Sequence, residues 1–160
     1  MTTGYAVITA IGICLVAAAL EGVCAGSQVK PFFARLRFPP YSAPLWLWSI
    51  IGGLYYVIFW FILYRLLKLD GGAALKSVAL ALILVMMVIN ALTNYLIFRA
   101  QNLRFSFIVG AFFPVLDAAL FLCLMRLDQT AASSLIPYLL YRVYAVWWGY
   151  GLWKLNGRTT

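Results

Sequence analysis

The sequence predicts an all-α polytopic membrane protein, built as a bundle of five transmembrane helices. Of its 160 residues, 66% are hydrophobic and 10% are charged, whereas a soluble domain carries about a quarter charged residues. Five separate apolar runs are long enough to cross a bilayer, which takes roughly 20 residues as a helix. This composition excludes a soluble enzyme, a disordered chain and a disulfide-stapled secreted domain.

The predicted helices belong to one domain, residues 1–160, and cover about residues 5–25, 44–67, 73–98, 105–125 and 135–154. Each run is continuous and lacks the alternation of a barrel strand, so helices are the expected spanning structure. We interpret the first run as a retained helix and not as a signal peptide, because residues 1–5 contain no lysine or arginine.

The connectors are short except for residues 26–43, which contain Pro31, Pro39 and Pro40. Proline fixes its own φ and biases the preceding residue toward extended geometry. We therefore expect a structured loop there, not a helix. Residues 99–104 and 128–133 are expected to form turns, and the Gly-Gly pair at 71–72 separates the second and third helices.

The lysines and arginines of the connectors are distributed unevenly between the two ends of the predicted bundle. Seven lie on the side of the long loop and the C-terminal tail, and four lie on the opposite side. Because positive charge favours the cytoplasmic side, we expect that loop and the C-terminus in the cytoplasm and the N-terminus outside. The net charge of +8 is spread over short connectors, unlike the single basic face of a nucleic-acid-binding protein. Membrane lipids are expected partners, and nucleic acid is not.

Patterns that indicate catalysis or metal binding are absent from the sequence. It has no histidine, three scattered cysteines, no closely spaced pair of carboxylates and no glycine-rich phosphate loop. We therefore expect no metal site and no required cofactor, and we favour a binding protein over an enzyme.

Several polar side chains fall inside the predicted helices, where each is costly. Glu21 lies about one turn from the end of the first helix, and we interpret it as a carboxylate that reaches the membrane interface; the alternative is a ligand contact. Asn90, Thr93 and Asn94 share one face of the third helix because of their i, i+3, i+4 spacing. They form either interhelical hydrogen bonds or a polar patch in a cavity.

Asp117 and Arg142 are predicted to form a charge pair inside the bundle. Counted from the turn between the fourth and fifth helices, both lie roughly 11–12 Å from the same membrane face, at about 1.5 Å per residue. Pairing avoids the cost of an isolated charge at that depth; the alternative is that each side chain reaches the interface separately.

Ala18, Gly22 and Gly26 form a small-residue stripe that suits close packing, within the bundle or across a dimer.

Two stretches resemble the TspO/MBR family of translocator and tryptophan-rich sensory proteins. The first is the run from Pro39-Pro40 to Trp48, which is similar to the family's Pro-Pro motif at the entry to the second helix. The second lies on the fifth helix and comprises Pro137-Tyr138-Leu139-Leu140-Tyr141, then Ala145, then Trp153-Lys154-Leu155-Asn156. An asparagine of the family's third helix falls at Asn90. The resemblance covers most of the chain.

The chain resembles a divergent member, because several positions depart from the family pattern. Ser42 and Tyr141 stand where the family usually has tryptophan, Gly52 where it has tyrosine, and Gly149 where it has asparagine. Asp117 and Arg142 have no family counterpart that we can place.

The resemblance implies a five-helix bundle, often a homodimer, with a pocket near the long loop for a tetrapyrrole such as protoporphyrin IX or, in some members, a sterol. Carried over residue by residue, the ligand-binding candidates are Pro39, Pro40, Trp48, Asn90, Tyr138, Tyr141 and Ala145. A sterol-recognition pattern is also matched, by Val146, Tyr150 and Lys154; its alternative interpretation is an ordinary helix end with an interfacial lysine.

We therefore predict an integral membrane binding protein, a sensor or translocator, that takes up a hydrophobic polycyclic ligand between its helices. The expected cavity lies under the long loop, which acts as its lid, and is lined by Trp48, Asn90 and Ala145. Light-dependent porphyrin degradation, which some members carry out, is expected to be weak here because Tyr141 offers a smaller ring than tryptophan.

Two alternatives come from other functional classes. One is a small membrane enzyme that acts on a lipid or isoprenoid, with Glu21, Asp117 or Arg142 as its working charges. The other is a packing subunit that binds no ligand.

Overall fold

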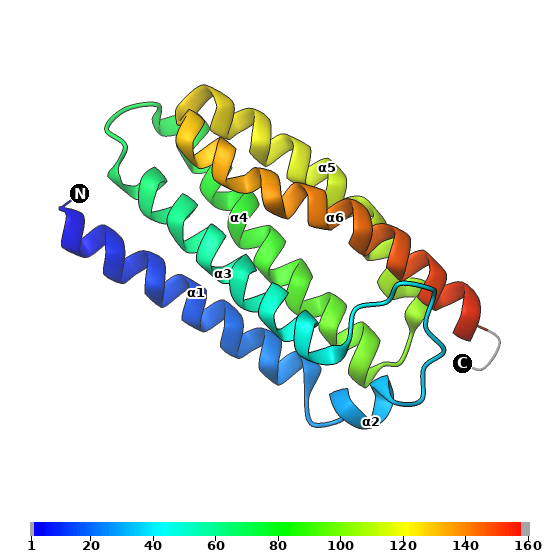
Figure 1. Ribbon diagram of the computed structural model, residues 1–160. Helices are drawn as coiled ribbons and strands as arrows, with labels where there is room; N and C mark the ends of the chain where they lie inside the picture. The colour runs from blue at the N-terminus through cyan, green and yellow to red at the C-terminus, as the bar shows by residue number, and fades with distance from the viewer. Residues whose placement is uncertain (1, 158–160) are drawn as a thin grey trace.

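The computed structural model describes residues 2–157, and this part of the chain is helical, without a strand. Its elements are α1 (Thr3–Ala25), α2 (Val29–Phe33), α3 (Leu45–Lys68), α4 (Ala73–Asn94), η1 (Tyr95–Arg99), α5 (Leu103–Leu127) and α6 (Gln129–Asn156). The long helices lie side by side, and the start of α1 and the end of α6 fall at opposite ends of the bundle (Figure 1). The all-α prediction is confirmed.

Four helical stretches are long and apolar enough to cross a membrane: α1, α3, α4 together with η1, and α5. Helix α6 has 28 residues, but its tyrosines, tryptophans and Arg142 lower its mean hydropathy. Large apolar side chains also point outward from the bundle; Val16 on α1, Phe112 on α5 and Val143 on α6 are each about two-thirds exposed or more. Helices that are apolar on all sides are typical of a lipid environment, and the chain is an integral membrane protein.

The bundle is packed tightly in one half and is hollow in the other. In the half that contains the α3–α4 connection and the α5–α6 junction, large apolar side chains from four helices have no exposed surface; they are Phe59, Ile62, Leu66, Ile83, Met86, Leu120, Leu124 and Leu135. In the half next to the long loop, a smaller core of Phe32, Leu103, Trp148 and Leu152 lies beside a cavity. The tight half holds the helices in register, and the cavity lies in the other half.

Helix α6 begins at Gln129, so the turn predicted at residues 128–133 is wrong. Asp128 alone joins α5 to α6, and its carboxylate accepts hydrogen bonds from the backbone N–H groups of Thr130 and Ala131. Such a cap satisfies donors that the first turn of a helix leaves unpaired. The Arg65 guanidinium binds the same carboxylate through two nitrogens, at 2.6 and 3.0 Å. These hydrogen bonds, led by that from Arg65, hold the pKa of Asp128 below its ordinary value.

The long loop, residues 26–44, contains the short helix α2, which corrects the expectation of a non-helical segment. Pro31 lies at the third position of α2, within the first turn, where a missing N–H breaks no intrahelical hydrogen bond. A second departure from the prediction lies at the end of α4, where η1 forms one π-helical turn and the N–H of Ala100 donates to the carbonyl of Tyr95.

Helix α1 buries a different face from the one that carries Gly22 of the small-residue stripe. Its buried residues are Ala6, Ala10, Cys14 and Ala17. On the predicted stripe, Gly22 is exposed, and a Cβ added there would meet nothing within 4 Å. Packing inside the bundle therefore does not explain Gly22.

Candidate ligand cavity

A cavity of about 230 Å³ lies between the five long helices, beside the long loop. Aromatic side chains make up much of its wall: Phe33, Trp48, Tyr55, Phe98, Phe107, Tyr138, Tyr141 and Trp148. Polar groups come from Glu21 on α1, from Asn90, Thr93 and Asn94 on α4, from Ser106 on α5 and from Arg142 on α6. A small number of polar groups in a mostly apolar wall is typical of a small-molecule site.

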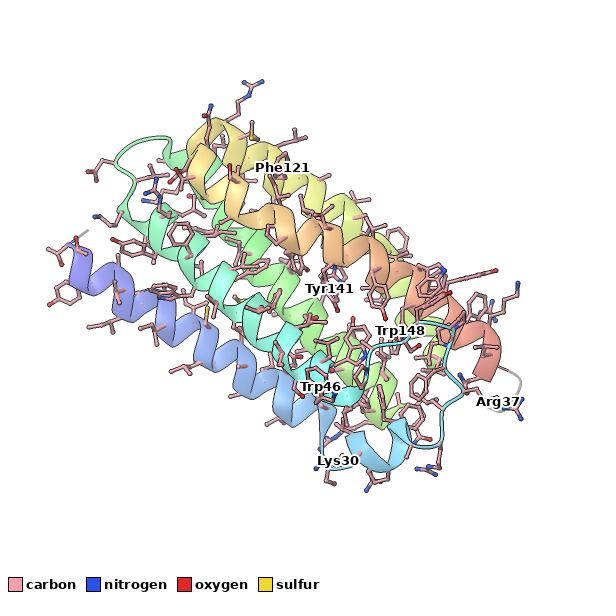
Figure 2. The ribbon with its side chains drawn as sticks, viewed as in Figure 1. Lys30, Arg37, Trp46, Phe121, Tyr141 and Trp148 are labelled. Carbon is pink, nitrogen blue, oxygen red and sulfur yellow. The ribbon has the colours of Figure 1, made fainter. Side chains whose placement is uncertain are left out.

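Trp48 is the centre of an aromatic cluster on the side of the cavity that faces the long loop. Its ring centroid lies 4.6 Å from that of Trp148 and 6.1 Å from those of Tyr141 and Tyr144. Figure 2 shows Tyr141 near the middle of the bundle and Trp148 close to the long loop. The indole N–H of Trp48 donates to the carbonyl of Ala43 at 3.0 Å, so the cluster also fixes the end of the loop.

Glu21 is the centre of a polar cluster in the cavity wall. Its Oε2 accepts hydrogen bonds from the Tyr56 hydroxyl at 2.6 Å and from Nδ2 of Asn90 at 3.0 Å. Its Oε1 accepts one from Nδ2 of Asn94 at 2.9 Å. The cluster ties α1 to α3 and α4 at the level of the cavity.

This arrangement tests the interpretations that the sequence left open for Glu21, Asn90, Thr93 and Asn94. The expectation that Glu21 reaches the membrane interface is wrong, because its carboxylate turns into the bundle and lines the cavity. For Asn90 and Asn94, both interpretations hold: each makes an interhelical hydrogen bond to Glu21, and each also lines the cavity. Thr93 lines the cavity and donates its hydroxyl to the carbonyl of Ile89 on its own helix.

The structure brings Asp117 and Arg142 together between α5 and α6. Nε of Arg142 lies 3.4 Å from Oδ2 of Asp117, and Asp117 is 2% exposed. The Arg142 guanidinium also contacts the Tyr138 hydroxyl and lies 4.0 Å from the centroid of the Phe113 ring. Arg142 lines the cavity, whereas Asp117 lies behind it, outside the lining.

The backbone of the long loop is bound to the C-terminal half of α6. Asn156 accepts from the N–H of Arg37 at 2.9 Å and donates to the carbonyl of the same residue at 2.8 Å. The Tyr144 hydroxyl accepts from the N–H of Ala43 and donates to the carbonyl of Tyr41, both at 3.1 Å. These contacts close the loop over the cavity end of the bundle (Figure 1).

Side-chain contacts reinforce this closure. The indole N–H of Trp148 donates to the Ser42 hydroxyl at 3.0 Å, and that hydroxyl donates to the carbonyl of Pro39 at 2.7 Å. Pro39 packs directly on Gly151, where an added Cβ would lie 2.9 Å from Cβ of the proline. Only a residue without a side chain allows the loop to approach α6 so closely.

The candidate residues from the sequence separate into two groups. Six of them line the cavity together: Trp48, Asn90, Tyr138, Tyr141, Ala145 and Val146. The other four lie outside the lining: Pro39 is buried where the loop packs on α6, Pro40 is exposed, and Lys154 donates to the exposed Tyr150 hydroxyl at 3.3 Å. The interpretation of Tyr150 and Lys154 as an ordinary helix end agrees with this position.

Helix α5 contributes a part of the wall that was not predicted from the sequence. Ser106, Phe107 and Gly110 line the cavity, and the i, i+4 spacing of Ser106 and Gly110 places two small residues on one helix face. That spacing was the sequence signal for a cavity wall on α5. Tyr56 on α3, whose hydroxyl donates to Glu21, was also not predicted.

Comparison with known proteins agrees with the resemblance found in the sequence. A search of curated proteins finds no match to the chain. The profile of the TspO/MBR family matches residues 10–154, which include all the long helices in whole or in large part. Because this match extends over nearly the whole chain, the chain belongs to the TspO/MBR family.

Proposed function

We propose that this protein binds a hydrophobic polycyclic molecule in the cavity between its helices, as a membrane sensor or translocator. The observation that carries the proposal is the cavity itself, whose lining combines the rings of Trp48 and Tyr141 with the polar cluster of Glu21, Asn90 and Asn94. Aromatic faces supply affinity for a flat ring system, and a few placed polar groups orient it.

The volume of the cavity limits what enters without rearrangement. An apolar protein cavity of about 150 Å³ binds benzene, so 230 Å³ suits a somewhat larger ring system. A tetrapyrrole such as protoporphyrin IX is several times the size of benzene, and a sterol is also larger. We expect that these ligands require the long loop to move away from α6.

The proposal includes α6 as a fifth membrane span. Its only charge in the middle of the helix, Arg142, is paired with Asp117, and pairing lowers the cost of a charge at that depth.

Homodimer formation is part of the proposal as well. The outer face of α1 supports it, because Gly12 and Gly22 leave open space there, and small residues allow helices of two subunits to approach closely.

A ligand-binding role is better supported than the membrane-enzyme alternative. Of the three charges that the alternative depends on, Asp117 lies outside the cavity lining and Glu21 is held by three hydrogen bonds. A general acid or base must reach the reacting group within hydrogen-bond distance, and Asp117 does not meet that condition.

The test is a titration of the detergent-solubilised protein with protoporphyrin IX and with anthracene, followed by quenching of tryptophan fluorescence. Trp48→Ala is expected to weaken binding of either ligand by about tenfold or more, because it removes the indole ring at the centre of the aromatic cluster. Trp46→Ala is the matched control, since Trp46 is 64% exposed and outside the cavity lining. Equal binding by both variants and the unmodified protein, with helical content unchanged, would remove Trp48 from the site.

A further inference from the structure

We propose that the ligand of this cavity carries a carboxylate group and that Arg142 binds it. This inference rests on the proposed function and deepens it, because it assigns the acidic group of the ligand to one side chain of the wall. It is carried by the unpaired N–H donors of Arg142, by the fixed position of its guanidinium and by the charge of the surface at the cavity end of the bundle.

Arg142 is the charged residue of the lining whose hydrogen-bonding capacity the protein leaves open. The lining holds two charged residues, Glu21 and Arg142, and the Glu21 carboxylate already accepts three hydrogen bonds from protein side chains. A guanidinium has five N–H donors and no acceptor. Within residues 2–157 only one of the five, on Nη2, makes a hydrogen bond, and its acceptor is the Tyr138 hydroxyl. Because polar groups away from bulk water normally have partners, the acceptor atoms of a ligand suit the remaining donors of Arg142.

The ion pair with Asp117 keeps Arg142 charged but does not use its donors. Nε of Arg142 lies 3.4 Å from Oδ2 of Asp117, and neither atom makes a hydrogen bond within the described part of the chain. Nη1 has no hydrogen-bonded partner there either, but unlike Nε it is not fully buried. Since Arg142 lines the cavity, Nη1 is the nitrogen that a ligand can reach.

The guanidinium is held in one position by its neighbours. Tyr138, one turn earlier on α6, contacts Nη2 through its hydroxyl, and the centroid of the Phe113 ring lies 4.0 Å from the guanidinium carbon. The side chain of Arg142 is 12% exposed. A donor group that is already fixed loses little conformational freedom when a ligand binds, and the planar guanidinium matches the two oxygens of a carboxylate.

The surface at the cavity end of the bundle has the charge that attracts an anionic ligand. Basic residues lie there in the long loop, around the connection before α5 and near the end of α6: Lys30, Arg35, Arg37, Arg99, Arg104 and Lys154. Figure 2 shows two of them, Lys30 and Arg37, beside the long loop. Within residues 2–157 no acidic residue lies on this surface, because two are inside the bundle and Asp70 and Asp128 join helices at the other end. A surface of one sign raises the local concentration of ligands of the opposite sign.

The experiment compares two probes of nearly the same shape that differ in charge. They are 9-anthraceneacetate, which is ionised at neutral pH, and 9-anthraceneacetamide, in which a neutral NH₂ replaces one carboxylate oxygen. Both are titrated into the protein in phosphatidylcholine nanodiscs with tryptophan quenching as the readout, and dialysis against nanodiscs without protein gives the free concentration of each probe. The unmodified protein is expected to bind the acetate about tenfold more tightly than the amide, because hydrogen bonds between charged partners are the stronger ones.

Two variants test whether Arg142 is the group responsible. Asp117→Asn combined with Arg142→Gln removes both members of the ion pair, so that neither charge is left uncompensated. It is expected to weaken binding of the acetate by about tenfold or more and that of the amide by less than about twofold. Arg142→Lys keeps a positive charge beside Asp117 but removes the planar set of donors, and it is expected to weaken acetate binding by about threefold or more. The matched control is Arg126→Gln, which removes an exposed arginine from the last turn of α5 and is expected to leave both affinities unchanged.

The outcomes separate this inference from the proposed function. If the amide binds and the double variant leaves acetate affinity unchanged, the carboxylate inference is overturned and the proposed function stands. Equal losses for both probes would assign Arg142 to the shape of the cavity and would also overturn the inference. If the double variant does not fold, the unmodified protein and Arg142→Lys decide: acetate binding no tighter than amide binding, or unchanged by the lysine, overturns the inference. If neither probe quenches the unmodified protein, both proposals fail.

Discussion

At the scale of single residues, Asp117 and Arg142 illustrate how a bundle stabilises charge in its interior. Both side chains are nearly buried and 3.4 Å apart, and neither carboxylate oxygen of Asp117 accepts a hydrogen bond from another described residue. Each charge thus depends on the other. Removing one member of a buried pair leaves the other uncompensated, which costs about 3–5 kcal/mol.

We expect Asp117→Asn and Arg142→Gln each to lower the free energy of unfolding by several kcal/mol, and the double variant to lose less than the sum of the two. Unfolding in mixed detergent micelles measures all four proteins of the cycle. The coupling energy reports the interaction between the two charges. Losses that add without coupling would mean that each side chain is stabilised independently.

The residue scale also shows what the sequence could predict. The equal depth of Asp117 and Arg142 followed from helix rise alone, since both are counted from one turn. The orientation of Glu21 did not follow, because three groups on α3 and α4 determine it and their rotation about the helix axes is a tertiary property. The departures Gly52 and Gly149 were visible in the sequence, yet only the fold places them in the cavity wall.

At the scale of elements, hydrophobic length predicted the long helices, while local hydrogen bonds determined where they end. Helix α6 starts at Gln129 because Asp128 caps it, and α2 forms although it contains Pro31. A run of apolar residues gives no signal for the π-helical turn of η1. There the N–H of Ala100 donates to the carbonyl five residues earlier, that of Tyr95, and not to the carbonyl four residues earlier as in an α-helix. The closure of the long loop depends on Gly151, whose role becomes visible only when α6 and Pro39 are brought together.

We expect Gly151→Ala to loosen the long loop. The added Cβ would lie 2.9 Å from Cβ of Pro39, and overpacking of this kind costs about 1–3 kcal/mol, enough to raise loop opening at least about fivefold. The rate of trypsin cleavage after Arg37, within the loop, measures the opening. Gly149→Ala is the control, because its added Cβ would make an ordinary 3.8 Å contact with Phe107. Equal cleavage rates in the two variants would show that Gly151 does not govern closure.

At the scale of the whole molecule, the packed half and the hollow half lie at opposite ends of the bundle. The cavity lies at the end that holds the long loop and the end of α6, and the start of α1 lies at the other end (Figure 1). The positive-charge bias of the connectors predicts that the cavity end faces the cytoplasm. A ligand that enters past the loop would arrive from that side.

This topology predicts that the two ends of the chain lie on opposite sides of the membrane, with the N-terminus outside. Single cysteines at Thr2 and Thr159, in a parent variant without Cys14, Cys24 and Cys123, are probed in intact cells with a maleimide that does not cross membranes. We expect labelling at position 2 at once and at position 159 only after the membrane is permeabilised, because the five proposed spans would place the two positions on opposite sides. Labelling of both positions from one side would mean that α6 does not cross. A reversed pattern would keep five spans and would contradict the charge bias alone, since helix length and charge asymmetry are independent properties of the sequence.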